Sequence, residues 1–272
     1  MRRVPKKYFR WLKLIVIVYC SLGIAFYYLQ KKILFHPTEI ATGTTFKFKQ
    51  PFKETNIQID ELTSYNLVQF TVPDSLKKGV VLYFHGNRAN INRYAKFAKN
   101  FTKHGYEVWM PDYPQYGKST GELTEENLYQ ESLQIYKMAR AQFPPEKIIL
   151  YGKSMGTGIA SQLASIRDCK QLILETPYNS MVSLMEYYAP IFPMSTLLQF
   201  KIPSNQFLEK VTAPICVFHG TDDGVIPLSN AEKLKAVLKK SDAFITIDGG
   251  NHFNLNESSL MQKSLDSLLI IN

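Results

Sequence analysis

Cysteine is scarce in this sequence, which holds only Cys20, Cys169 and Cys216 in 272 residues. Three widely spaced cysteines do not make the paired framework of a small disulfide-stabilised domain. Cys20 lies in an apolar run and Cys216 in a predicted buried strand, so we interpret them as packed thiols. No cysteine has the spacing to a histidine that a zinc site requires, so the sequence predicts no metal site.

Acidic residues are absent before Glu39, whereas eight of the 32 lysines and arginines lie in that stretch. The net charge of +9 therefore belongs almost wholly to the N-terminus. The rest of the chain carries 24 basic and 23 acidic residues, a balance that gives it no electrostatic reason to bind nucleic acid. We predict no nucleic-acid partner.

Charged residues are also missing from positions 14–30, "LIVIVYCSLGIAFYYLQ", an apolar run that Trp11 and Leu12 extend. At about 1.5 Å per helical residue, this run just spans the hydrocarbon core of a bilayer. The sequence predicts a transmembrane anchor over 11–30. Two alternatives remain open, a buried core helix and a cleaved signal peptide, the latter because "GIA" at 23–25 resembles a cleavage site.

The basic residues that flank this run predict its orientation. Six precede it and only Lys31 and Lys32 follow directly, which favours a cytoplasmic N-terminus and a domain outside the cytoplasm. We divide the chain into a basic stub at 1–10, the anchor at 11–30, a juxtamembrane segment at 31–55 and a folded domain at 56–272.

The folded domain alternates short apolar runs with amphipathic segments, the pattern of a mostly parallel sheet with helices on both faces. Two earlier strands, at 56–60 and 65–72, predict an antiparallel hairpin. The core strands are expected at 79–84, 106–110, 147–151, 171–175, 213–218 and 243–247. The helices are expected at 91–103, 123–142, 156–167, 229–240 and 256–270.

One segment interrupts this alternation. Positions 176–210 are too long and too rich in methionine and aromatic residues for a surface loop, and they contain four prolines. We predict an inserted cap over about 176–210.

The stretch 148–160, "IILYGKSMGTGIA", contains G-K-S and so resembles a nucleotide-binding loop. A phosphate-binding P-loop needs a second glycine five residues before Gly152, but that position is Lys147, inside a predicted strand. A dinucleotide fingerprint drawn from Gly156, Gly158 and Ser161, with Glu175 as the ribose acid, starts too far from the strand and lacks a third glycine. Neither nucleotide site is favoured.

The same stretch contains G-x-S-x-G between a predicted strand and a predicted helix. At such an elbow the serine adopts a strained conformation, and neighbouring backbone leaves room only for glycine two residues on either side. Gly152, Ser154 and Gly156 fit this pattern. The alternative is a tight turn in which Ser154 only caps the helix.

A serine nucleophile needs a histidine base that a carboxylate orients. The chain order serine, acid, histidine that this elbow requires leaves His252, in "DGGNHFN", and sets aside His36, His85, His104 and His219. Asp222 and Asp223, in "HGTDDGVIP", are the candidate acids.

The chain resembles the α/β-hydrolase superfamily of serine hydrolases through "YFHGN" (83–87), "GKSMG" (152–156), "HGTDDGVIP" (219–227) and "GNHF" (250–253). The family pattern H-G-x-x-D-x-x-x-P aligns the acid with Asp223 rather than Asp222. The segment "YLQKKILFHPT" also resembles a branch with one N-terminal anchor, which includes bud-emergence-type hydrolases and mammalian depalmitoylating relatives. The loop "PDYPQYGKSTG" (111–121) departs from the family's D-Y-R-G-Y-G-x-S at Pro114 and Gln115.

The resemblance implies an α/β-hydrolase fold, an oxyanion hole formed by the backbone N–H groups of Met155 and Asn87, and no cofactor. It predicts a membrane-anchored serine hydrolase that cleaves carboxylic esters or thioesters. The apolar cap indicates a lipid-like acyl substrate, unless its apolar face only packs on the sheet. A serine peptidase and a non-catalytic scaffold remain alternatives, and the sequence leaves the oligomeric state open.

Overall fold

The computed structural model describes residues 6–270. The first five positions of the predicted basic stub and the last two of the predicted domain lie outside the described residues. The helices are α1 (Lys6–Leu34), α2 (Ile91–Tyr94), α3 (Lys99–Thr102), α4 (Glu125–Arg140), α5 (Met155–Ala164), α6 (Met181–Tyr188), α7 (Met194–Leu197), α8 (Ser204–Leu208), α9 (Leu228–Ala231) and α10 (Ser259–Ile270).

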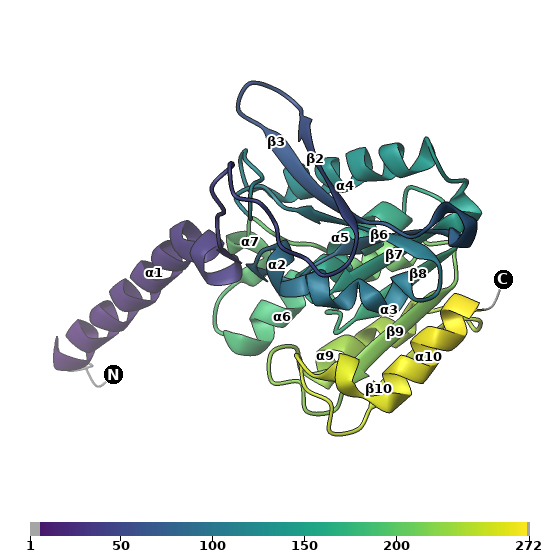
Figure 1. Cartoon of the computed structure of the whole chain (residues 1–272). Helices are drawn as coiled ribbons and strands as arrows, with labels where there is room; N and C mark the ends of the chain where they lie inside the picture. Colours follow the sequence, from purple (N-terminus) through teal and green to yellow (C-terminus); the bar gives the residue numbers. More distant parts are fainter. Residues whose placement is uncertain (1–5, 271–272) are drawn as a thin grey trace.

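An eight-stranded sheet forms the centre of the domain, in the order β10-β9-β8-β7-β4-β6-β3-β2 (Figure 1). The six strands from β10 to β6 are parallel, and β3 and β2 are added antiparallel at one edge. The predicted, mostly parallel sheet is confirmed. The strands of this sheet are β2 (Phe52–Gln58), β3 (Ser64–Phe70), β4 (Gly79–Phe84), β6 (Tyr106–Asp112), β7 (Ile148–Lys153), β8 (Gln171–Glu175), β9 (Ile215–Gly220) and β10 (Ala243–Ile247).

Helices cover both faces of this sheet, as the continuous apolar strands require. Along β4, Val80 and Leu82 belong to the core beneath α4 and α5. Val81 and Tyr83 point to the opposite face and belong to the core beneath α3 and α10. The alternation of side chains along a strand thus supplies two hydrophobic cores from one run of apolar residues.

Two predicted helices are irregular. The segment expected at 91–103 consists of α2, a 3-10 turn at Ala95–Phe97 and α3, and the segment expected at 229–240 consists of α9 and a 3-10 helix at Glu232–Ala236. The apolar spacing that predicted them is similar in both helix types, so the pattern alone does not separate a continuous α-helix from a mixed one.

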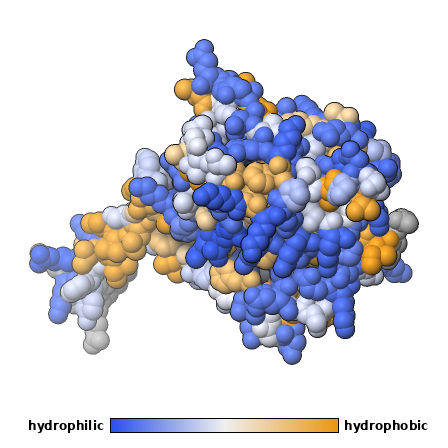
Figure 2. Space-filling model, viewed as in Figure 1, coloured by the Kyte–Doolittle hydropathy of each residue, from blue (hydrophilic) through white to orange (hydrophobic). Residues whose placement is uncertain are grey.

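Helix α1 extends away from the domain (Figure 1), and its projecting surface is hydrophobic along the middle and hydrophilic at the outer end (Figure 2). Within residues 6–270 it is the one helix long and apolar enough to cross a membrane. Its most apolar window has a mean hydropathy of 2.0 and is only 6% buried. This exposure argues against the core-helix alternative, because a core helix is mostly buried.

The predicted cap comprises α6, α7 and α8, and α1 packs against it near α7. The Tyr19 ring stacks on Phe192 with ring centroids 4.8 Å apart, and the Tyr19 hydroxyl donates to the Ile191 carbonyl at 2.9 Å. Gln30 is fully buried; its Nε2 donates to the Leu197 carbonyl at 3.1 Å, and its Oε1 accepts from the Gln199 N–H at 2.7 Å. The apolar helix and the cap are therefore joined by specific contacts.

We expect Gln30→Ala to loosen this junction, because it leaves the Gln199 N–H and the Leu197 carbonyl without their buried partner, a loss of about 1–3 kcal/mol. Amide hydrogen exchange in detergent measures it, and the Gln199 amide should exchange roughly tenfold or more faster. Tyr28→Ala, at a position of α1 that is 76% exposed, is the control and should leave this amide unchanged. Equal exchange rates of the Gln199 amide in wild type and Gln30→Ala would show that Gln30 does not hold α1 to the cap.

Candidate active site

Ser154 lies in a strained turn between β7 and α5. Its φ is +52°, in the region that favours glycine, and its N–H donates to the Glu175 carbonyl at 2.8 Å. A Cβ at Gly152 would lie 2.5 Å from the Gly156 carbonyl oxygen, and a Cβ at Gly156 would lie 2.1 Å from the Phe84 carbonyl oxygen. Both flanking positions therefore require glycine, as the elbow pattern predicts.

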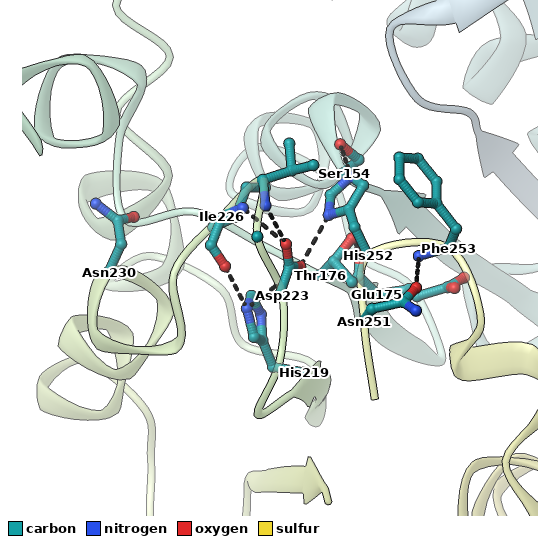
Figure 3. Close-up of polar contacts among 12 residues, drawn as sticks. Ser154, Glu175, Thr176, His219, Asp223, Ile226, Asn230, Asn251, His252 and Phe253 are labelled. Carbon is teal, nitrogen blue, oxygen red and sulfur yellow. Dashed lines mark hydrogen bonds and ion pairs between the residues drawn. The ribbon is translucent and has the colours of Figure 1, made fainter. Parts of the chain in front are cut away.

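The structure brings Ser154, His252 and Asp223 together (Figure 3). Nε2 of His252 lies 2.9 Å from Oγ of Ser154, and Nδ1 of His252 lies 2.8 Å from Oδ2 of Asp223. All three residues are buried, with at most 8% of their surface exposed. These contacts are those of a histidine that takes the proton of a serine while a carboxylate holds its other nitrogen.

The two candidate acids have different surroundings. Oδ1 of Asp223 accepts hydrogen bonds from the Val225 and Ile226 N–H groups, each at 2.8 Å. Burial acts to raise the pKa of Asp223, but the hydrogen bond and charge of His252 and the two N–H donors outweigh it and lower this pKa. Asp222 is exposed and accepts from the Thr221 hydroxyl. The geometry therefore favours Asp223.

The predicted oxyanion residues lie beside Ser154, with Met155 at the start of α5 and Asn87 in the loop after β4. Within residues 6–270 neither backbone N–H donates to another protein group. The Asn87 carbonyl accepts from the Tyr116 hydroxyl at 2.8 Å and from the His36 N–H at 2.9 Å, and the Asn87 side chain donates to the Leu34 carbonyl at 2.7 Å.

Comparison with known proteins shows which family and fold this chain resembles. A family model described as alpha/beta hydrolase fold matches residues 79–197. The structure also resembles an esterase of Pyrococcus furiosus, with a TM-score of 0.66 and 15% identity over 87% of this chain and 96% of that one. The chain is an α/β-hydrolase by fold, and residues 79–197 match the family itself.

Relatives of this α/β-hydrolase include the Caenorhabditis elegans alpha/beta hydrolase domain-containing protein aho-3, 33% identical over 177 residues, which are 63% of this chain and 52% of that protein. Alpha/beta hydrolase domain-containing protein 17C of Xenopus tropicalis is 31% identical over 193 residues, 69% of this chain and 59% of the relative. The match thus spans little more than half the length of these relatives. They support the predicted resemblance to the depalmitoylase-like branch.

His219 is a residue of this α/β-hydrolase that the sequence reasoning set aside. It is fully buried below Asp223, with Nε2 2.9 Å from the Ile226 carbonyl and 3.5 Å from Oδ2 of Asp223 (Figure 3). Burial is the main cause of its lowered pKa. The chain order of the motifs excluded His219 as the base, but it gave no sign of this supporting contact.

Lys153 and Glu175 belong to the sequence patterns that resemble nucleotide-binding sites, but in this α/β-hydrolase they bind each other. Lys153 forms a buried ion pair with Glu175, whose carboxylate also accepts from the Tyr151 hydroxyl and from Nδ2 of Asn256. A Cβ at Gly158 would lie 2.2 Å from the Ile202 side chain, so this glycine allows close packing of α5. These contacts stabilise the turn at Ser154 and do not form a phosphate-binding loop.

The lowered pKa of Asp223 generates a prediction about stability. A carboxyl whose folded pKa is below its ordinary value of 3.8 stabilises the fold above that value, and this contribution is lost as the pH falls through the folded pKa. We expect Asp223→Asn to lower the Tm by a few degrees at about pH 6 and by less at about pH 3. Thermal unfolding measures this difference.

Asp222→Asn, at the neighbouring exposed carboxylate, is the matched control for that experiment. It should change the Tm little at either pH. A Tm difference for Asp223→Asn that stays constant from about pH 6 to about pH 3 would contradict the ionised pair with His252.

Proposed function

We propose that this protein is a membrane-anchored serine hydrolase that cleaves carboxylic ester or thioester bonds through an acyl-enzyme. The observation that carries the proposal is the continuous hydrogen-bonded line from Ser154 through His252 to Asp223, at 2.9 and 2.8 Å. A strained elbow supports it, and so do the adjacent backbone N–H groups of Asn87 and Met155, which donate to no group within residues 6–270.

In the proposed reaction His252 accepts the Ser154 proton at Nε2 as Oγ attacks the carbonyl carbon. The negative oxygen of the tetrahedral intermediate accepts hydrogen bonds from the N–H groups of Asn87 and Met155, each worth about 3–4 kcal/mol of barrier. His252 then returns the proton to the leaving group, and the carbon–leaving-group bond breaks. Water, deprotonated by His252, attacks the acyl-enzyme and frees the acid.

An apolar cavity of about 290 Å³ beside Ser154 supports an acyl substrate. Its lining joins the cap to the end of α1 and includes Leu34, Phe35, Tyr178, Met181, Leu184 and Met185. The cap's apolar side chains therefore do more than pack on the sheet. None of the lining residues within 6–270 carries a carboxylate, so this cavity favours an acyl chain over the amine of a peptide terminus.

The membrane part of the proposal is supported by α1, which has the length and hydropathy to span a bilayer and continues into the wall of the apolar cavity. A cytoplasmic N-terminus and an extracytoplasmic domain follow from the basic residues before the helix. Lys31, one of the two basic residues after the apolar run, pairs with Glu122 of the domain at 3.3 Å. This partner gives Lys31 a structural role apart from membrane orientation.

Fluorophosphonate labelling tests the nucleophile. We expect wild type to be labelled, Ser154→Ala to be unlabelled, and His252→Ala to be labelled at least about a hundredfold more slowly because the base is lost. Ser165→Ala, at the end of α5 with its hydroxyl bonded to Gln162, is the control and should label as wild type does. Equal labelling of all four proteins would refute Ser154 as the nucleophile and, with it, the proposed function.

The apolar cavity predicts that activity on p-nitrophenyl esters rises with acyl chain length, by about threefold per added methylene while the chain still fits. Met185→Trp, which fills part of the cavity, should abolish the gain for long chains and spare hydrolysis of the acetate. Initial rates over the ester series measure both effects. Activity that is flat with chain length in wild type would argue against a lipid-like substrate.

A further inference from the structure

A second cavity borders Ser154 on the side of His252. Its volume is about 330 Å³, and Phe253 and Phe97 contribute to its wall. Its charged lining consists of four cations against one carboxylate: Arg88, Arg93, Lys96 and Lys153 against Glu257. Of these residues only Arg88 also lines the apolar cavity, so the two cavities share this arginine and differ in the other charges.

Three of these cations have no acidic partner. Lys153 is neutralised by its buried ion pair with Glu175. Arg88, Arg93 and Lys96 are exposed, and across the described residues 6–270 no carboxylate lies within ion-pair distance of any of them. Unpaired like charges around one hollow create a positive potential that concentrates anions there.

The position of His252 distinguishes the roles of the two cavities. Both are lined by Ser154, but His252 lines only the basic one, and Met155 lines only the apolar one. The group that leaves must take its proton from Nε2 of His252, so it departs on the basic side. The acyl group, which stays bound to Oγ of Ser154, then lies on the apolar side.

We propose that the basic cavity is a leaving-group subsite for a phosphate-bearing alcohol, so that the substrate is an acyl ester with a phosphate head, as in a lysophospholipid. This inference rests on the proposed serine hydrolase. A phosphate carries more negative charge than a carboxylate and matches the fork of an arginine, which suits a site with Arg88 and Arg93. The acyl carbon bonds to Oγ as its bond to the alcohol oxygen breaks, and the phosphate-bearing alcohol leaves with the His252 proton.

The arrangement also fits the membrane anchor. The apolar cavity is walled by the last turn of α1, and Arg88 lies on β5 (Arg88–Ala89), which pairs with the juxtamembrane strand β1 (His36–Pro37). An amphiphile therefore lies with its chain toward the end of α1 and its charged head toward Arg88, Arg93 and Lys96.

A pair of lipids that differ only in the head tests this subsite. The full-length protein in neutral detergent is given 1-dodecanoylglycerol 3-phosphate or 1-dodecanoylglycerol, and both fatty-acid release and protection of Ser154 from a fluorophosphonate are measured. We expect wild type to prefer the phosphate lipid by about tenfold in kcat/KM or in protection, as expected for several partly exposed charge pairs. The preference should fall when salt is raised from about 0.05 M to about 1 M.

Variants that each remove one positive charge test whether the preference for the phosphate lipid arises in this cavity. Lys96→Gln and Arg93→Gln should each reduce the ratio between the two lipids severalfold, whereas Lys99→Gln, an exposed lysine two residues beyond Phe97 that does not line the cavity, should keep it. Equal use of both lipids by wild type, or an equal loss of preference in Lys99→Gln, would overturn the subsite. Absence of fluorophosphonate labelling at Ser154 would instead refute the serine hydrolase and the subsite with it.

Discussion

The close packing of α5 against β4 and β7 is the constraint on which the site depends. The backbone of Gly156 approaches the Phe84 carbonyl so closely that a single added carbon would lie 2.1 Å away. This approach pins the start of α5 at the carboxyl end of the central strands and forces Ser154 to a φ of +52°. The strain at one residue is maintained by the two hydrophobic cores on either face of the sheet.

The parallel sheet then places the other members of the site. Strands β9 and β10 run side by side, so the loops that follow them emerge at the same edge as the elbow. Asp223 follows β9 and His252 follows β10, which explains why residues 29 positions apart meet at 2.8 Å. His219, at the end of β9, contacts Asp223 from below and holds the turn at Ile226. The acid is thus supported on the side away from His252.

Helix α1 contacts the active site directly. Its last turn walls the apolar cavity, the Leu34 carbonyl accepts from the Asn87 side chain, and β1 pairs with the strand that follows Asn87. Tyr116, in the loop that departs from the family pattern at Pro114 and Gln115, holds the Asn87 carbonyl from the other side. The loop expected to supply an oxyanion donor is therefore held between the segment that follows α1 and the domain.

The sequence determined the features that depend on local chemistry. Alternating apolar runs specified the sheet, two glycines around Ser154 specified the elbow, and the order of serine, acid and histidine singled out His252. It left Asp222 and Asp223 to be separated by a family pattern, and it gave no sign of the roles of His219, Leu34 or Gln30. Those roles arise from contacts between residues far apart in the chain, such as Gln30 with Gln199 and Asn87 with Leu34. Such pairs have no periodicity or spacing to reveal them, so they emerge only when packing brings α1, the cap and the strand ends together.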